Sequence, residues 1–287
     1  MSQSIQKVGV IGAGNIGLGV ACDYLFQGFQ VVLVDNSQQV IEKASQEVVN
    51  TLRLAPIINR DLTPITSEEE IAARFKVSTE LGDISDCDFI VENITEKKSL
   101  KKDLYHQLND YADDSACFAA NTSCISITEI GGYSKRPDRV IGIHFMNPSY
   151  LKPTVEVIRG DHTSEETINT TLAMLGQMGK EAVVVNDLPG FVSNRISHLF
   201  MNEAAFVVQD QLASPEQVDK IFKECFGHKM GPLETADLIG LDTVMYSLEV
   251  LYESYQDPKY RCCPLLKKMV AGGSLGKKAK RGFYNYK

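Results

Sequence analysis

A glycine-rich turn near the N-terminus is the first group of residues that could do chemistry. The sequence Gly12-Ala13-Gly14-Asn15-Ile16-Gly17 directly follows the apolar run from Lys7 to Ile11 and opens a helical pattern. In this context the first glycine permits a tight turn, the second lets the backbone approach a pyrophosphate, and the third lets the helix pack on the strand. We therefore expect a dinucleotide to bind at Gly12, Gly14, Asn15, Ile16 and Gly17.

An acidic residue follows this turn at the distance that a dinucleotide site requires. The next apolar run, Gln30 to Val34, ends in Asp35, roughly 20 residues beyond the glycines. The Asp35 carboxylate would accept hydrogen bonds from the adenosine ribose and would repel a 2'-phosphate, and residues 36–39 offer no Arg to bind one. The pattern predicts NAD rather than NADP. The alternative is a glycine-rich turn of a parallel sheet that binds no nucleotide.

His144 is the histidine best placed to act on a substrate proton. It ends the apolar run that begins at Val140, and ligands of open parallel sheets bind at the carboxyl ends of strands. The next run, Thr154 to Ile158, carries Glu156 at its centre. If the two runs pair as a hairpin turning near Tyr150, the numbers of opposite residues sum to about 300, which sets His144 against Glu156. A carboxylate beside an imidazole orients a general base, although such a pair can also be merely structural.

The strands that must position these residues are visible as short apolar runs, of the kind that fully buried strands show. They alternate with longer helical patterns, which indicates strand-helix-strand crossovers. The sequence therefore predicts an α/β fold with a Rossmann-type, doubly wound, mostly parallel sheet. The runs are Lys7 to Ile11, Gln30 to Val34, Phe89 to Val91, Cys117 to Ala120, Val140 to Phe145, Thr154 to Ile158 and Ala182 to Val185.

The chain changes class after Pro189-Gly190, where the strand-like runs stop. Helical periodicity takes over, with apolar residues at spacings of three and four: Ile196, Leu199, Phe200, Ala204, Val207 and Val208. This change predicts an NAD-binding Rossmann domain over residues 1–187 and an all-helical domain over residues 188–287.

Composition excludes several other classes of protein. The 287 residues carry a formal net charge of -8, which argues against a general nucleic-acid binder. The 7 Cys are dispersed without a C-x-x-C pair, so neither a disulfide framework nor a zinc site is indicated. No run approaches the roughly 18 apolar residues of a membrane span, and the N-terminus has no signal-peptide pattern. We expect a cytoplasmic protein that binds no metal, nucleic acid or membrane.

Further motifs occur in a fixed order along the chain. They are Val91-Glu92-Asn93-Ile94-Thr95-Glu96, Asn121-Thr122-Ser123, His144-Phe145-Met146-Asn147-Pro148, Val155-Glu156-Val157-Ile158, residues 187–195 (Asp-Leu-Pro-Gly-Phe-Val-Ser-Asn-Arg), Met230-Gly231-Pro232 and Gly282-Phe283-Tyr284. Together with the glycine turn and Asp35, they make the chain resemble the NAD-dependent 3-hydroxyacyl-CoA dehydrogenases over nearly its full length. The resemblance is strongest to the short 3-hydroxybutyryl-CoA dehydrogenases.

The resemblance implies roles for the residues that match. His144 would be the catalytic base and Glu156 its partner, while Ser123 and Asn194 would bind the substrate's oxygens. The resemblance also places three residues near the nicotinamide or the His144 network, as cofactor-binding residues: Glu96, Asn121 and Asn147. The helical domain would bind substrate and form a homodimer, which would cover the apolar face that contains Ile196, Leu199 and Phe200.

Ser123 and Asn194 carry short neutral donors, which suit the polarisation of a carbonyl group. Each also has a structural alternative. Ser123 could be the N-cap of a helix that begins near Ser126, and Asn194 could cap the helix that follows Pro189-Gly190. The sequence leaves both alternatives open.

Two segments depart from the family pattern. In the family, the helix after the second strand continues into a Lys-rich run that meets the phosphates of coenzyme A, whereas residues 50–60 here contain Arg53, Arg60 and no Lys. The turn over residues 149–154 is also less apolar than the family's. A minority branch of the family acts on acyl groups held by acyl carrier proteins, in the synthesis of antibiotic extender units. We therefore expect a 3-hydroxyacyl thioester of either CoA or an acyl carrier protein.

Two other functions remain as alternatives. One is a dehydrogenase of free hydroxy acids or sugar acids, similar to the enzymes akin to lambda-crystallin, which would not use pantetheine. The other is a non-catalytic NAD-binding protein. The joint presence of His144, Glu156, Ser123 and Asn194 disfavours the latter, because a pure binder needs no base.

Overall fold

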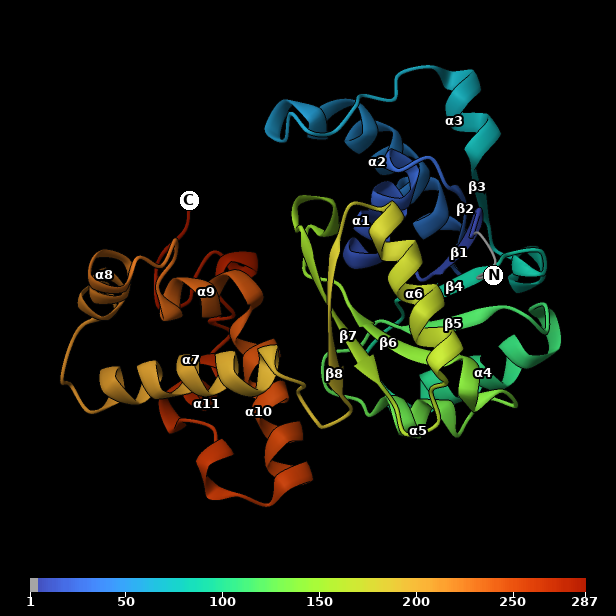
Figure 1. The fold of residues 1–287 in the computed structure, drawn as a ribbon. Coiled ribbons are helices and arrows are strands. Elements are labelled where there is room, and N and C mark those ends of the chain that lie inside the picture. The colour runs from blue at the N-terminus through green and yellow to red at the C-terminus, as the bar shows by residue number, and fades with distance from the viewer. Residues whose placement is uncertain (1–4) are drawn as a thin grey trace. The chain divides into compact units, whose positions relative to one another are not determined.

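The seven apolar runs of the first two thirds of the chain, together with one further strand, form one sheet of eight strands (Figure 1). The structure is a computed structural model that describes residues 5–287. The strands lie in the order β3-β2-β1-β4-β5-β6-β7-β8. Neighbours from β3 to β6 are parallel, β7 is antiparallel to β6, and β8 is parallel to β7. Their bounds are β1 Lys7–Ile11, β2 Gln30–Val34, β3 Phe75–Ser78, β4 Phe89–Glu92, β5 Cys117–Ala120, β6 Val140–His144, β7 Thr154–Arg159 and β8 Glu181–Asn186.

The two edge strands differ from what the sequence predicts. β3 has no counterpart among the predicted runs, because it has four residues, includes Lys76 and has no fully buried position. β8 is present as predicted, but the expectation that it is fully buried is wrong: Val183 and Val184 are 48% and 42% exposed. An edge strand has a neighbour on one side alone, and its own composition does not reveal that position.

Helices cover both faces of this sheet, as the doubly wound prediction requires. Since alternate residues of a strand point to opposite faces, each strand contributes to two layers. On one face, Val20 of α1, Val48 of α2 and Leu175 of α6 join one apolar core. On the other face, Tyr105 of α4 meets Phe118 of β5. The bounds are α1 Asn15–Phe26, α2 Gln38–Ile58, α3 Glu68–Arg74, α4 Lys98–Tyr111, α5 Ile127–Gly131 and α6 Glu165–Gln177, with short 3-10 turns η1 Leu81–Ile84, η2 Pro137–Arg139 and η3 Ser149–Leu151.

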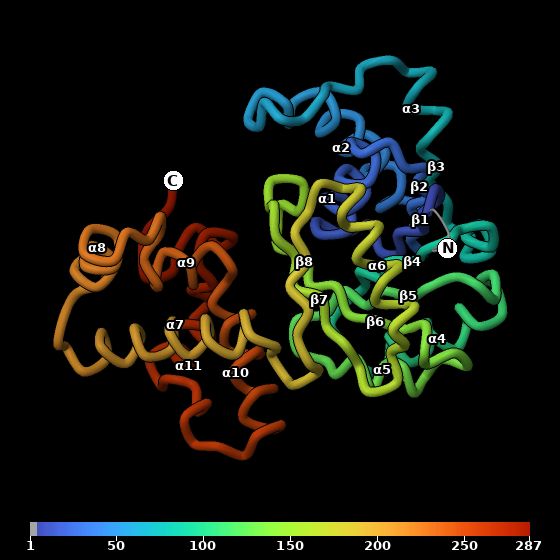
Figure 2. The backbone as a smooth tube through the Cα atoms, viewed as in Figure 1, coloured from blue at the N-terminus to red at the C-terminus, as the bar shows by residue number. Residues whose placement is uncertain are grey.

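The chain divides into two compact units, the second of which is Pro189–Lys287. This second unit is built from helices, and Figure 2 traces its path from yellow to red. Met201 of its first helix packs with Leu241 and Leu248 in an apolar core. The bounds are α7 Ser193–Gln209, α8 Pro215–Phe226, α9 Pro232–Ile239, α10 Leu241–Tyr255 and α11 Pro264–Ala271, with 3-10 turns η4 Pro258–Tyr260 and η5 Lys277–Ala279. The predicted fold class, a mostly parallel Rossmann-type sheet followed by helices, is confirmed.

The C-terminal Gly282-Phe283-Tyr284 motif is tied to the second unit by a buried acid. The Asp237 carboxylate accepts hydrogen bonds from the backbone amides of Phe283 and Tyr284, at 3.0 and 2.9 Å. Gly282 is required there, because a Cβ atom would lie 1.9 Å from an Asp237 oxygen. Within residues 5–287, no helix has both the length and the apolar character needed to cross a membrane.

Candidate active site

The glycine turn between β1 and α1 has the shape that a pyrophosphate needs. Gly12 has a φ of +92°, and a Cβ there would lie 2.7 Å from the carbonyl oxygen of Asn93. A Cβ on Gly17 would lie 1.8 Å from the carbonyl oxygen of Gly12, so the third glycine lets α1 pack against the turn. A Cβ on Gly14 would meet nothing within 4 Å, which leaves open space at the position where backbone must approach a phosphate.

The residues around the turn also fit NAD electrostatically. α1 begins at Asn15 and Ile16 with Gly14 as its N-cap, and no acidic residue in its first turn opposes the positive end of the helix dipole. Asp35 accepts hydrogen bonds from the backbone amides of Ala13 and Ser37, at 2.9 and 3.1 Å. An ionised carboxylate has about four lone-pair sites, so each oxygen can accept a further bond from a ribose hydroxyl.

His144 and Glu156 are direct neighbours across the β6–β7 pair. The register pairs His144 with Glu156 and Gly142 with Ile158, so the predicted sum of residue numbers is confirmed. Glu156 Oε2 lies 3.0 Å from His144 Nδ1, and the two residues are 9% and 6% exposed. An Nδ1–H bond to the carboxylate directs the other ring nitrogen, Nε2, toward the strand end. Burial shields this pair from competing water.

Ser123 lies at the other side of the imidazole. Its hydroxyl oxygen is 3.2 Å from His144 Nε2, so Ser123, His144 and Glu156 form one chain of polar contacts. The structure excludes Ser123 as a helix cap: α5 begins at Ile127, and its N-cap is Ser126, which accepts a hydrogen bond from the amide of Glu129. The arrangement can take a proton at Nε2 and hold an oxygen beside it.

Glu96 holds the loop that presents Ser123. Its Oε1 accepts hydrogen bonds from the Thr122 hydroxyl and from the backbone amides of Ser123 and Cys124, the latter two at 3.0 and 3.1 Å. A carboxylate that accepts several backbone bonds fixes a loop strongly, because bonds to charged groups are the stronger ones. Glu96 therefore orients Ser123, a role that the sequence did not predict.

A buried ion pair supports the same strand ends. Lys101 Nζ contacts Glu92 Oε1 at 2.6 Å, and both side chains are almost completely buried. Burial raises the pKa of Glu92, and the charge of Lys101 opposes that rise. The pair was missed in the sequence, although a carboxylate that ends the apolar run Phe89 to Val91 was the available signal.

Asn121 links three strand ends around the site. Its amide donates to Asn93 Oδ1 at 2.7 Å, and its Oδ1 accepts from the amide of Phe145 at 3.2 Å. Asn147 lies on the turn after β6 and is exposed. Its Oδ1 is 3.9 Å from where a Cβ on Gly19 of α1 would be, so this turn lies against the dinucleotide helix.

Asn194 belongs to the second unit. It is the second residue of α7, whose N-cap is Val192, so the alternative that Asn194 caps this helix is ruled out. The backbone oxygen of Asn194 lies 3.0 Å from His198 Nδ1 within the same helix.

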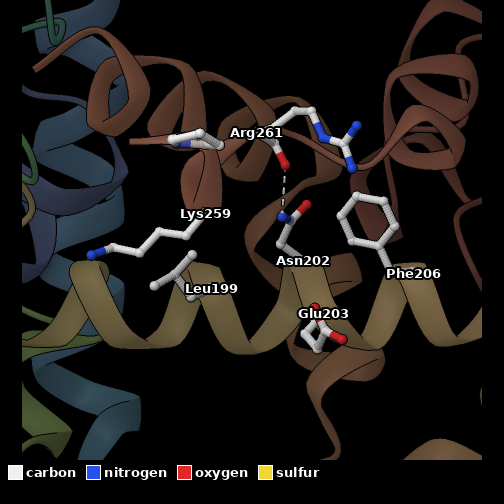
Figure 3. A pocket seen from close by; sticks show the side chains of 7 residues that line it. Leu199, Asn202, Glu203, Phe206, Lys259 and Arg261 are labelled. Carbon is white, nitrogen blue, oxygen red and sulfur yellow. Dashed lines mark hydrogen bonds between the residues drawn. The ribbon is translucent and has the colours of Figure 1, made fainter. Parts of the chain in front are cut away.

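Each unit contains one cavity of note. In the first unit a cavity of about 640 Å³ is bordered by the end of α2, the β6–β7 turn and the residues that precede β8. In the second unit a cavity of about 350 Å³ lies beside α7, where Asn202 donates a hydrogen bond to the carbonyl oxygen of Arg261 (Figure 3). His144 lines neither cavity. Across residues 5–287, no group of three or more His, Cys, Asp or Glu could hold a metal ion.

A dinucleotide turn with an acid–base pair at a strand end of the same sheet defines the class of NAD-dependent dehydrogenases. Comparison with known proteins gives the family. The model of the 3-hydroxyacyl-CoA dehydrogenase NAD-binding domain matches residues 7–188, and that of the 3-hydroxyacyl-CoA dehydrogenase C-terminal domain matches residues 190–286. The chain belongs to the 3-hydroxyacyl-CoA dehydrogenase family, as the resemblance predicted, with NAD as its cofactor.

Similar proteins match the whole chain. A probable 3-hydroxybutyryl-CoA dehydrogenase of Deinococcus radiodurans is 42% identical over 98% of this chain and 100% of its own. A 3-hydroxybutyryl-CoA dehydrogenase of Bradyrhizobium diazoefficiens is 39% identical over 100% of this chain and 97% of its own. The crystal structure of the (S)-3-hydroxybutyryl-CoA dehydrogenase of Ralstonia eutropha superposes with a TM-score of 0.92, at 40% identity, over 99% of this chain and 100% of its own.

Proposed function

We propose that the enzyme interconverts a short 3-hydroxyacyl thioester and its 3-oxo form, with His144 as general base and Glu156 as its partner. The polar chain from Ser123 through His144 to Glu156 at the end of β6 is the observation that carries this proposal. Relatives named 3-hydroxybutyryl-CoA dehydrogenases support a four-carbon acyl group. The proposal predicts NADH oxidation with acetoacetyl-CoA and NAD reduction with (S)-3-hydroxybutyryl-CoA. Absence of turnover with the four-carbon thioester on CoA and also on a carrier protein would refute it.

The side chains divide the chemistry between them. When NAD is bound at the glycine turn, it supplies the hydride acceptor for the alcohol carbon. His144 Nε2 removes the hydroxyl proton, and Glu156 stabilises the positive imidazolium that results. Ser123 donates a hydrogen bond to the substrate oxygen, and Asn194 binds a second oxygen. Glu96, Asn121 and Asn147 complete the cofactor site beside the glycine turn and Asp35.

The carrier is a separate part of the proposal. A carrier-protein substrate is favoured by the end of α2, where Leu54, Ile57 and Ile58 are exposed. Residues 50–60 contain two cations, Arg53 and Arg60. Arg53 Nη2 lies 3.8 Å from Glu68 Oε1, so the charge of Arg53 is partly neutralised within the protein. The apolar helix end beside the exposed Arg60 suits the acidic, partly apolar surface of a carrier protein better than the phosphates of free CoA.

Steady-state kinetics with both carriers tests this choice. We expect a lower KM for a 3-oxobutyryl group on its carrier protein than on CoA, and Arg60→Glu should raise the carrier-protein KM more at low salt than at high salt. Saturation by micromolar acetoacetyl-CoA without a gain from the protein would assign CoA as the carrier. Free 3-hydroxybutyrate and sugar acids complete the comparison, because turnover of these alone would indicate a free-acid dehydrogenase.

Assembly and location complete the proposal. We infer a homodimer formed by the second unit, supported by the exposed side chains of Ile196 and Phe226, which are 64% and 67% exposed. Phe200, by contrast, packs on Phe222 within its own unit. The 7 free cysteines suit a reducing cytoplasm. Light scattering of the purified protein tests the dimer.

A further inference from the structure

Lys180, which immediately precedes β8, is a buried cation with three partners. Its Nζ lies 2.9 Å from Asp23 Oδ2, and both side chains are less than a tenth exposed. The same ammonium donates to the carbonyl oxygens of Ser149 and Lys152, at 2.9 and 2.8 Å. Two of the three N–H donors of the ammonium thus bind backbone carbonyl groups, and the Asp23 carboxylate balances its charge as an ion pair.

The two carbonyl partners bracket η3, within the connection between His144 and Glu156. Ser149 begins η3 and Lys152 follows its end. Asn147 precedes η3 by two residues and is exposed, so its own side chain does not anchor the turn in the apolar core. The position of this segment therefore depends on what holds η3.

Asp23 connects the same ammonium to the dinucleotide helix. It lies on the buried side of α1, whose first residues follow the glycine turn. One turn before Asp23 in the same helix, Gly19 lets α1 approach the β6–β7 turn closely, since a Cβ on Gly19 would lie 3.4 Å from the Ser149 hydroxyl oxygen. Lys180, just before β8, thus contacts both α1 and the ends of η3 through its Nζ atom.

We infer that Lys180, held by Asp23, is a positioning residue that fixes the β6–β7 turn against α1 and so orients Asn147 toward the bound dinucleotide. This inference rests on the proposed function, which assigns Asn147 to the cofactor site. The two carbonyl contacts tie the ion pair to both ends of η3, so the pair holds the turn itself. Apolar residues would fill the same space without desolvating two charges.

A charge-neutral double variant separates positioning from folding. Removing one charge would leave the other buried and unpaired, so Asp23→Ala and Lys180→Met are combined. The matched control is Lys7→Met with Asp86→Ala, which removes an ion pair of 2.6 Å at the start of β1, away from the glycine turn. Circular dichroism establishes that both proteins fold, and titration of NADH fluorescence gives the dissociation constant.

A mutant cycle with Asn147→Ala gives the decisive readout. We expect the Asp23→Ala/Lys180→Met protein to bind NADH about tenfold more weakly, with the control unchanged. Asn147→Ala should cost a similar factor in the wild-type protein and little in the double variant, because the side chain is already misplaced there. The KM for NADH should rise by the same factor as the dissociation constant.

Three results would overturn the inference: unchanged NADH affinity in the folded double variant, additive losses in the cycle, or no loss from Asn147→Ala. Titration of NADH requires no acyl substrate. A wild-type protein that binds NADH but reduces no 3-oxoacyl thioester would therefore contradict the proposed function, while the cycle would still decide the role of Lys180.

Discussion

Glu96 accepts a hydrogen bond from the backbone amide of Ser123, so a residue that follows β4 sets the position of the hydroxyl beside His144. The neighbouring amide of Cys124 and the hydroxyl of Thr122 bind the same carboxylate oxygen. The loop therefore has one anchor for three donors. Loss of this anchor should affect Ser123 more than any other residue of the site.

Replacing Glu96 by Ala should lower both turnover and stability. A hydrogen bond to a charged acceptor contributes roughly 1.5 to 3 kcal/mol to stability. Water can replace the carboxylate at some of the three donors, so we expect the free energy of unfolding to fall by about 2 kcal/mol in total. Turnover should fall by about tenfold or more, because Ser123 leaves its contact with His144. Urea unfolding and steady-state kinetics measure the two effects. Glu96→Gln, which keeps an acceptor oxygen, should lose less in both.

Replacing His144 should remove chemistry without removing the cofactor. His144→Gln should lower turnover by roughly 10²- to 10⁴-fold, the usual worth of a general base. NADH affinity should change little, since the glycine turn and Asp35 bind the remote half of the cofactor. Glu156→Gln should lower turnover by a smaller factor, because the imidazole keeps a neutral partner. A His144→Gln protein with normal turnover would show that the pair is structural.

Asp35 should decide between the two nicotinamide cofactors. Its carboxylate would meet a 2'-phosphate with like charge, so kcat/KM for NADH should exceed that for NADPH by a large factor. Asp35→Ala should reduce the ratio of kcat/KM for NADH to kcat/KM for NADPH, mainly because the variant binds NADH more weakly. The ratio of kcat/KM values for the two cofactors measures this effect in both proteins. Equal use of NADPH by the wild-type protein would contradict the assignment.

The sequence predicted the His144–Glu156 contact because the residue numbers of paired positions in a hairpin have a constant sum, which the position of the turn sets. Two apolar runs joined by a short turn can pair in few ways, and burial of both runs selects one of them. The glycine turn was predictable for a similar reason, since each glycine answers a local backbone requirement. Membership of the family followed from motifs that span the chain.

The anchors of the site could not be predicted in the same way. Glu96 and Ser123 are 27 residues apart, and Lys180 is 157 residues from Asp23, so their contacts depend on the order of the strands. A buried charge in an apolar helix, such as Asp23, signals a partner without naming it. The sequence left open whether Ser123 and Asn194 cap helices, because Ser and Asn suit several positions near a helix start and only the backbone selects one.

Asp23 also predicts a specific dependence of stability on pH. Burial raises the pKa of Asp23 to about 6 from the ordinary value of 3.8, although the charge of Lys180 opposes the rise. Between these two values the folded protein holds a proton on Asp23 that the unfolded chain has released. Stability contributed by this group is therefore lost as pH rises through the window.

The change from pH 4.5 to 7 should cost the wild-type protein roughly 2 kcal/mol of unfolding free energy through Asp23 alone. The Asn side chain of the Asp23→Asn variant cannot titrate, and all other titratable groups are the same in the two proteins. The stability of the wild-type protein relative to Asp23→Asn should therefore rise by this amount when the pH falls from 7 to 4.5. Urea unfolding of both proteins at the two pH values measures it. If the difference in unfolding free energy between the wild-type protein and Asp23→Asn is the same at both pH values, Asp23 is ionised throughout the range, and its pairing with Lys180 outweighs its burial.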